Sequence, residues 1–200
     1  MKNRRWMLAL LPGSAAALLL AFGLTVGRSP TARAADKEEK AAKVSDPKEL
    51  EGKPAPGFSL ETLDGKPIKL SDLKKNVVVL DFWATWCPPC RKSLPHLEEF
   101  SKKKDLADKG LKVLAVNAHE DKEKVEKFMK DNNYSFSVPM DKDGSVMKDY
   151  GITGIPTTVI VSRGGKVHKT FVGFGDDSAK ELDKAIEEAL KEGKEAARAD

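Results

Sequence analysis

Two nearly continuous apolar runs lie in the middle of the chain. Val77–Trp83 reads VVVLDFW, and Leu111–Asn117 reads LKVLAVN. Because apolar residues occupy consecutive rather than alternate positions, both runs predict strands that are buried on both faces of a sheet. Two more strands are predicted at Thr157–Ser162 and Lys166–Val172, on either side of a glycine pair that suits a tight turn.

Other segments space their apolar residues as a helix or a hairpin does. Asp121–Asn132 and Asp177–Leu190 carry apolar residues three or four positions apart, which predicts two amphipathic helices. Nearer the start, Phe58–Leu63 and Pro67–Leu70 flank Asp64-Gly65, a strong signal for a β-hairpin.

The order of these elements predicts the fold class. A hairpin is followed by strand–helix–strand–helix and then by strand–strand–helix, which predicts an α/β fold with helices covering a mixed central sheet. We place this domain at residues 54–193, a span of about 140 residues and a usual size for one domain. Residues 35–53 are rich in Lys, Glu and Ala and predict a charged flexible linker, and residues 194–200 predict a disordered tail.

The N-terminal segment predicts export. Residues 1–5 are basic, residues 6–26 carry no charge, and Ala32-Arg33-Ala34 offers a cleavage site before Ala35. These features are typical of a secretory signal peptide over residues 1–34. An uncharged run of this length can also span a bilayer, so a retained N-terminal membrane anchor is the alternative. In either case the expected location is the periplasm or the cell envelope.

The charge balance argues against a nucleic-acid partner. The whole chain has a formal net charge of +4, but residues 1–34 hold five Lys or Arg and no Asp or Glu. The remaining residues include 30 basic and 31 acidic side chains. A nearly neutral mature protein lacks the electrostatic footprint of a nucleic-acid-binding protein.

Both cysteines of the chain lie in the short stretch FWATWCPPC. A bridge between Cys87 and Cys90 would close almost no loop and would add little stability, so in an exported protein the pair points to chemistry. Pro88 suits the first turn of a helix, which places Cys87 at a helix N-terminus, where free N–H groups and the dipole stabilise a thiolate. Cys90, one turn further on, would resolve the mixed disulfide.

Other residues are expected to belong to the same site. Asp81 interrupts a buried strand, where burial raises a carboxyl pKa and suits it to accept a proton from Cys90. An exposed acid on an edge strand is the alternative. Trp86 is expected on a docking surface beside Cys87. Ile155-Pro156 opens a later strand, where a trans peptide bond is the base-rate expectation and a cis bond would mark a functional feature.

Taken together, VVVLDFWATWCPPC, Pro95 and GIPTT resemble the thioredoxin superfamily. PAPGFSLETLDGKPIKLSDLKK, VLAVN and MDKDGSVMKDYGITGIPTTVIVSRGGKV resemble its exported TlpA/ResA-type, redoxin-like branch over most of the domain. The resemblance implies a thioredoxin-like fold with a βα-type insertion near residues 121–150, and a thiol–disulfide oxidoreductase. It also implies that Cys87 attacks, that Cys90 resolves, and that Pro156 is a cis-proline beside the active site.

Two positions depart from that branch. Many members have Glu three residues after the second cysteine, where this chain has Ser93. Many also have Asn at the position of Asp81. A role in cytochrome c maturation therefore does not follow from the resemblance.

The expected reaction is the reduction of protein disulfides. The Cys87 thiolate attacks a substrate disulfide whose chain pairs with the backbone of Ile155, and an external electron donor, expected in the membrane, re-reduces the pair. Pro88 and Pro89 withhold two N–H donors from the thiolate, which favours a reductant over a disulfide oxidant. No cofactor and no metal are expected, and a monomer is favoured.

Two alternatives come from other classes of protein. Paired thiolates suit Cu(I) or zinc, as in a metal-delivery module, but His96, His119 and His168 lie at none of the usual zinc spacings. A peroxidase-like redoxin is disfavoured because the chain lacks a P-x-x-x-T-x-x-C motif.

Overall fold

The computed structural model describes residues 44–199. Within them, the centre is a five-stranded sheet in the order β5-β4-β3-β6-β7. Strands β3, β4 and β5 run parallel to one another. Strand β6 runs antiparallel to its neighbour β3, and β7 runs antiparallel to β6. The predicted mixed central sheet is thus confirmed. Its strands are β3 (Val77–Trp83), β4 (Leu111–Ala118), β5 (Met140–Asp141), β6 (Thr157–Val161) and β7 (Val167–Val172).

The predicted hairpin is also confirmed. Strands β1 (Ser59–Glu61) and β2 (Pro67–Lys69) form a separate antiparallel pair. Gly65 lies in the connecting turn with φ of 80°, a conformation that glycine adopts without steric cost. A 3-10 helix, η2 (Leu70–Leu73), then leads the chain into β3.

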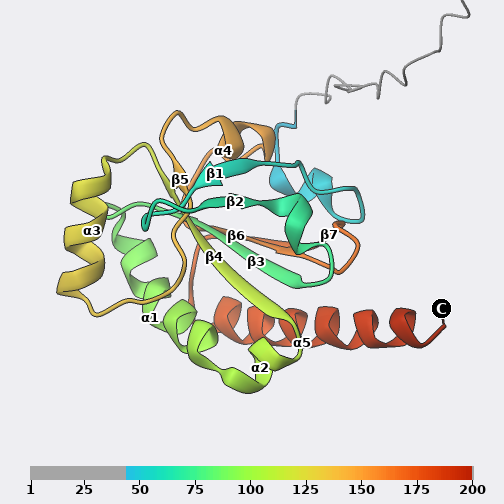
Figure 1. The fold of residues 1–200 in the computed structure, drawn as a ribbon. Coiled ribbons are helices and arrows are strands. Elements are labelled where there is room, and N and C mark those ends of the chain that lie inside the picture. Colours follow the sequence, from blue (N-terminus) through green and yellow to red (C-terminus); the bar gives the residue numbers. More distant parts are fainter. Residues whose placement is uncertain (1–43, 200) are drawn as a thin grey trace, which may run out of the picture. The chain divides into compact units, whose positions relative to one another are not determined.

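Helices and the hairpin cover the two faces of the sheet (Figure 1). Helices α1, α2 and α5 lie on one side, and the hairpin and α4 lie on the other. The predicted insertion near residues 121–150 contains α3, β5 and α4. The helices are α1 (Pro88–Lys102), α2 (Lys104–Asp108), α3 (Lys122–Asp131), α4 (Ser145–Asp149) and α5 (Asp176–Ala199).

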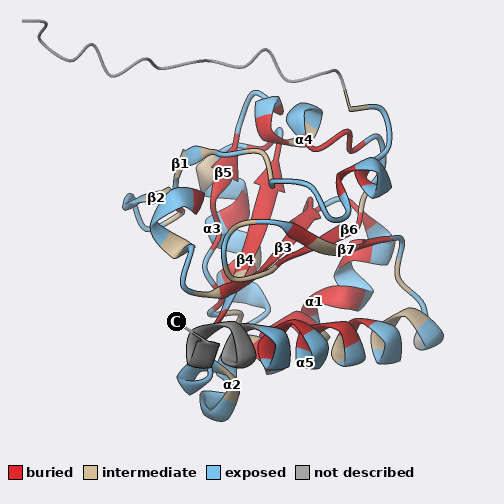
Figure 2. Cartoon of the chain, turned by 90° about the vertical axis from the view of Figure 1, so that its right-hand side faces the viewer, coloured by how far each residue is buried: buried red, intermediate tan, exposed pale blue. Residues whose placement is uncertain are grey.

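Strand β3 is buried along its whole length, and its side chains divide between two hydrophobic clusters. Val79 and Trp83 join the cluster beneath α1 and α5, whereas Leu80 and Phe82 join the cluster on the opposite face. Because side chains alternate along a strand, Asp81 belongs to the α1 face. Figure 2 shows the same layering, with buried strands between helices whose outer faces are exposed.

The packed domain begins earlier than the predicted boundary at residue 54. A 3-10 helix, η1 (Pro47–Leu50), buries Leu50 in the core. After it, Gly52 donates its N–H to the carbonyl oxygen of Val167, and Glu51 accepts the N–H and the hydroxyl of Thr170. These contacts hold the end of the predicted linker against β7, and a composition rich in charged residues gave no sign of them.

The predicted end of the domain and the predicted N-terminal segments compare differently with the structure. Helix α5 continues to Ala199, so the predicted end of the domain at residue 193 falls inside it. The predicted signal segment, residues 1–34, and linker residues 35–43 lie outside the described residues. Among residues 44–199, no helix combines the length and the hydrophobicity needed to cross a bilayer.

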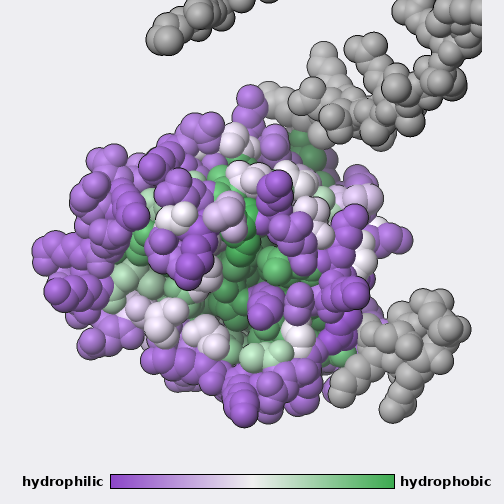
Figure 3. Space-filling view, in the orientation of Figure 1, coloured by the Kyte–Doolittle hydropathy of each residue, from purple (hydrophilic) through white to green (hydrophobic). Residues whose placement is uncertain are grey.

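The surface is largely polar. Figure 3 shows charged and polar side chains around the rim of one face and apolar side chains gathered toward its middle. Two large apolar side chains, Trp86 and Val172, are nevertheless well exposed. Trp86 directly precedes Cys87, and Val172 pairs with Thr157 beside Pro156, so both belong to the end of the sheet where the cysteines lie.

Candidate active site

The two cysteines lie at the start of α1, directly after β3. Cys87 is the N-cap residue of α1, and its sulfur accepts the backbone N–H of Cys90 at 3.2 Å. Pro88 and Pro89 occupy the first two helical positions, where a missing N–H costs no helical hydrogen bond. The sequence thus folds so that the positive end of the helix dipole faces the Cys87 sulfur.

Cys87 and Cys90 form a disulfide bond in this structure. Cys90 is 0% exposed and Cys87 is 2% exposed, so Cys87 is the more accessible of the two, as predicted, though only slightly. The hydroxyl of Ser93 donates to the carbonyl oxygen of Cys90 at 2.8 Å.

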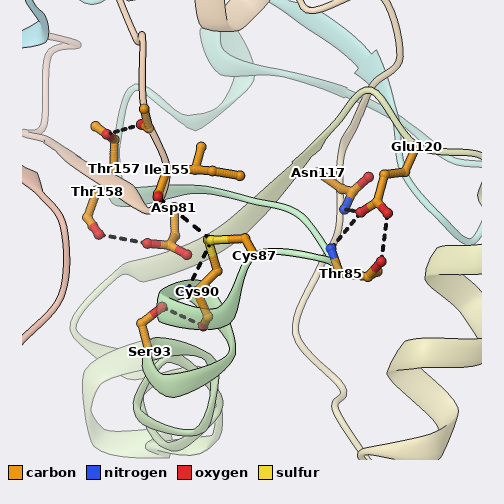
Figure 4. The surroundings of a disulfide bond; sticks show 11 residues. Asp81, Thr85, Cys87, Cys90, Ser93, Asn117, Glu120, Ile155, Thr157 and Thr158 are labelled. Carbon is orange, nitrogen blue, oxygen red and sulfur yellow. Dashed lines mark hydrogen bonds between the residues drawn. A yellow bond between two sulfur atoms is a disulfide. The ribbon is translucent and has the colours of Figure 1, made fainter.

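The loop before β6 lies against the disulfide. The Ile155–Pro156 peptide bond is cis, rather than the trans bond that base rates favour. The carbonyl oxygen of Ile155 lies 3.7 Å from the Cys87 sulfur (Figure 4). Trp86 is 61% exposed on the other side of Cys87. The fold therefore brings together four residues that the sequence analysis assigned to one site.

Asp81 lies beneath the disulfide on β3. It is fully buried, which excludes the alternative of a solvated acid on an edge strand. The hydroxyl of Thr158 donates to its Oδ1 at 2.7 Å, and in Figure 4 the carboxyl group lies between Thr158 and the disulfide. Its Oδ2 is also buried and has no hydrogen-bond partner within the described part of the chain.

Burial raises the pKa of Asp81 to about 7, although the hydrogen bond from Thr158 acts in the opposite direction. Removing a carboxylate from water disfavours its charged form, and the hydroxyl only partly compensates. A carboxyl group that titrates near neutral pH can take up and release a proton under working conditions. The sequence-based expectation of a raised pKa therefore agrees with the structure.

Glu120 is a buried acid of this region that the sequence analysis missed. It follows β4, and its carboxylate accepts the backbone N–H and the hydroxyl of Thr85, both at 2.6 Å. Asn117 and Lys124 donate to it as well, at 3.0 and 2.7 Å. Burial acts to raise the pKa of Glu120, but these hydrogen bonds together lower it. Since Thr85 is two residues before Cys87, Glu120 anchors the active-site loop.

Replacing Glu120 with glutamine is expected to lower the free energy of unfolding by about 2–4 kcal/mol. The four donors around Glu120 require an acceptor on both side-chain oxygens, and glutamine presents an NH₂ group in place of one of them. Urea denaturation would measure the loss. The matched control is Glu123→Gln, which alters an exposed neighbour and should change stability by less than about 0.5 kcal/mol. Equal effects of the two variants would show that Glu120 anchors nothing.

The histidines do not approach the cysteines in a way that suggests a metal site. His96 on α1 makes a 2.7 Å contact with Asp183 of α5, and His168 lies 3.5 Å from Glu192 of the same helix. His119 is exposed in the loop after β4. No group of three or more His, Cys, Asp or Glu residues among residues 44–199 is arranged to hold a metal ion.

Fold and site together define a thioredoxin-like thiol–disulfide oxidoreductase. A mixed sheet carries a C-x-x-C pair at the N-terminus of the following helix, opposite a cis-proline loop. The chain belongs to the Redoxin family, whose model matches residues 50–186.

Individual relatives agree with this assignment. The chain is 41% identical over 128 residues to the thiol-disulfide oxidoreductase ResA of Bacillus subtilis (strain 168). The matched region covers 64% of this chain and 70% of that protein. A thiol:disulfide interchange protein of the thioredoxin family from Chlorobium tepidum TLS superposes with a TM-score of 0.60 at 32% identity, covering 68% of this chain and 95% of the other. StoA from Bacillus subtilis superposes with a TM-score of 0.55, also at 32% identity, over 66% of this chain and 96% of its own.

Proposed function

We propose that the chain reduces protein disulfides in the cell envelope through the Cys87–Cys90 couple. The observation that carries this proposal is the position of the Cys87 sulfur, which caps α1 and lies 3.7 Å from the Ile155 carbonyl oxygen. In the reduced protein, the same position would stabilise a Cys87 thiolate beside a backbone segment that can pair with an extended substrate. Trp86 and Pro156 flank this position and would contact the substrate.

The proposed reaction has two exchange steps. The Cys87 thiolate attacks one sulfur of the substrate disulfide, which forms a mixed disulfide and releases the other substrate sulfur as a thiolate. Cys90 then loses its proton to Asp81 and attacks the Cys87 sulfur. This second step breaks the mixed disulfide, releases the second substrate thiolate and leaves the Cys87–Cys90 disulfide. Two electrons have then passed to the substrate, and an external dithiol donor, which we place in the membrane, must return them.

The reducing direction is supported by the start of α1. Pro88 and Pro89 have no backbone N–H. Within residues 44–199, the Cys87 sulfur accepts one hydrogen bond, from the backbone N–H of Cys90. Fewer donors make a less stable thiolate, and a less stable dithiol is a stronger reductant. The location rests on the export features of residues 1–34, and we propose that the protein acts there as a monomer.

Equilibration of the full-length chain against glutathione tests the direction. We expect a reduction potential below about −220 mV for the Cys87–Cys90 couple, in the range of cellular reductants. A value above about −150 mV would instead identify a disulfide oxidant. If no reversible dithiol couple were found, the redox function itself would be wrong, and metal binding by the thiolates would be the next property to measure.

A further inference from the structure

A single row of residues crosses the sheet beneath the disulfide. Asp81 on β3 pairs with Ala115 on β4 and with Thr158 on β6, and Thr158 pairs in turn with Phe171 on β7. Ala115 and Phe171 belong to the cluster beneath α1, so all four side chains point to the face that carries the cysteines. Ala115 and Phe171 have no side-chain donor, which leaves the Thr158 hydroxyl as the donor of this row.

The Thr158 hydroxyl distinguishes the two oxygens of the Asp81 carboxyl group. Oδ1 accepts the hydroxyl proton at 2.7 Å, while Oδ2 is buried without a hydrogen-bond partner anywhere in residues 44–199. Because Oδ1 is already an acceptor, a proton bound to neutral Asp81 resides on Oδ2. Ala115 is the neighbour of Asp81 on β4, and the cysteine pair of α1 lies beside it (Figure 4). No charged group contributes to the pKa shift of Asp81, whose causes are burial and the Thr158 hydrogen bond.

We infer that Thr158 is a positioning residue of the proton transfer, because its hydroxyl holds Oδ1 of Asp81 and leaves Oδ2 to exchange the proton with Cys90. In the resolving step, the proton leaves the Cys90 thiol for Oδ2. The Cys90 sulfur then attacks Cys87, and the substrate leaves as a thiolate. When an external dithiol re-reduces the protein, the proton returns from Oδ2 to Cys90. The inference rests on the role of Asp81 in the proposed function.

The hydroxyl also adjusts the strength of the base. A hydrogen bond to the carboxylate favours the charged form and so opposes the effect of burial on the pKa of Asp81. Without the hydroxyl, a larger fraction of Asp81 would be protonated at neutral pH, and a smaller fraction could accept a proton from Cys90. Thr158 thus acts on the reaction through Asp81, although it touches neither sulfur.

The test removes the hydroxyl and follows the pH dependence of insulin reduction by the full-length chain with dithiothreitol. We expect Thr158→Val to slow turnover at neutral pH by about five- to tenfold and to move the acidic limb of the profile, where activity rises with pH, upward by about one pH unit. Thr158→Ser keeps the hydroxyl and should restore both quantities, and Thr158→Ala serves if the valine variant fails to fold. Titration of the Asp81 carboxyl carbon by NMR should show the same upward movement.

Two further variants separate this inference from the proposed function. Thr170→Val removes a buried hydroxyl from the next strand, but Thr170 pairs with Val159 on the opposite face of the sheet, so the profile should not move. In an Asp81→Asn background, Thr158→Val should cause no further loss of rate. If Asp81→Asn slows turnover but Thr158→Val leaves rate and profile unchanged, Thr158 positions nothing. If Asp81→Asn itself has no effect, the proposed proton acceptor is wrong.

Discussion

Serine in place of Cys90 is expected to stop catalytic turnover and to leave the protein covalently joined to its substrate through Cys87. The variant keeps the nucleophile at the N-terminus of α1 but lacks the thiol that displaces the substrate. Insulin reduction should fall by at least about a thousandfold. Non-reducing electrophoresis should show a mixed disulfide that dithiothreitol releases.

Cys87→Ser is the matched variant, since it retains Cys90 and loses the accessible sulfur. It should be equally inactive but should form no adduct, because Cys90 is fully buried. An adduct formed through Cys90 instead of Cys87 would reverse the two roles. Full activity in either variant would remove the dithiol from the mechanism altogether.

Asparagine in place of Asp81 is expected to stabilise the fold at neutral pH by up to about 4 kcal/mol. Burial raises the pKa of Asp81 from 3.8 to about 7, so the native state holds a proton that the unfolded state releases. Well below pH 4 the Asp81 carboxyl group is protonated in both the native and the unfolded state, so its burial costs no stability there. Stability then falls as the pH rises toward 7 and the native carboxyl group must ionise in a buried position. Asparagine has no such cost and can still accept the Thr158 hydroxyl.

Denaturant unfolding at several pH values measures this effect. The difference between Asp81→Asn and the parent chain should grow between about pH 4 and about pH 7 and then level off. Asp108→Asn, at an exposed position on α2, should show no such growth. A difference that is constant with pH would mean that Asp81 is not held neutral by its surroundings.

Strong local patterns predicted the main elements of the fold. The apolar run of β3 and the turn at Asp64-Gly65 were read within a residue or two, because the signal lies in consecutive residues. No local pattern predicted strand β5 or helix α4, and the family resemblance implied only a βα-type insertion somewhere near residues 121–150. β5 has only two residues and exists through its pairing with the end of β4, and α4 begins where the buried Asp141 carboxylate accepts the N–H groups of Val146 and Met147. Such partners come from the folded chain.

The same distinction, between features visible in consecutive residues and contacts made only by the folded chain, applies to the residues of the candidate active site. The cysteine pair and Asp81 were recognisable because each breaks the local pattern, as two thiols three residues apart and a lone acid in an apolar strand do. Glu120 and Thr158 break no pattern. Glu120 meets Thr85 across 35 residues of chain, and Thr158 meets Asp81 across 77, so only the pairing of strands brings these partners together.

The segment that follows η1 has a consequence for the behaviour of the protein in solution. Strand β7 is an edge of the sheet, and an open edge offers unpaired N–H and C=O groups to which a second molecule can add a strand. Here Gly52, Lys53 and Ala55 take up that position through backbone hydrogen bonds with Val167 and Gly165. The chain thereby shields its own edge against self-association, a useful property wherever many copies are held close together at one surface.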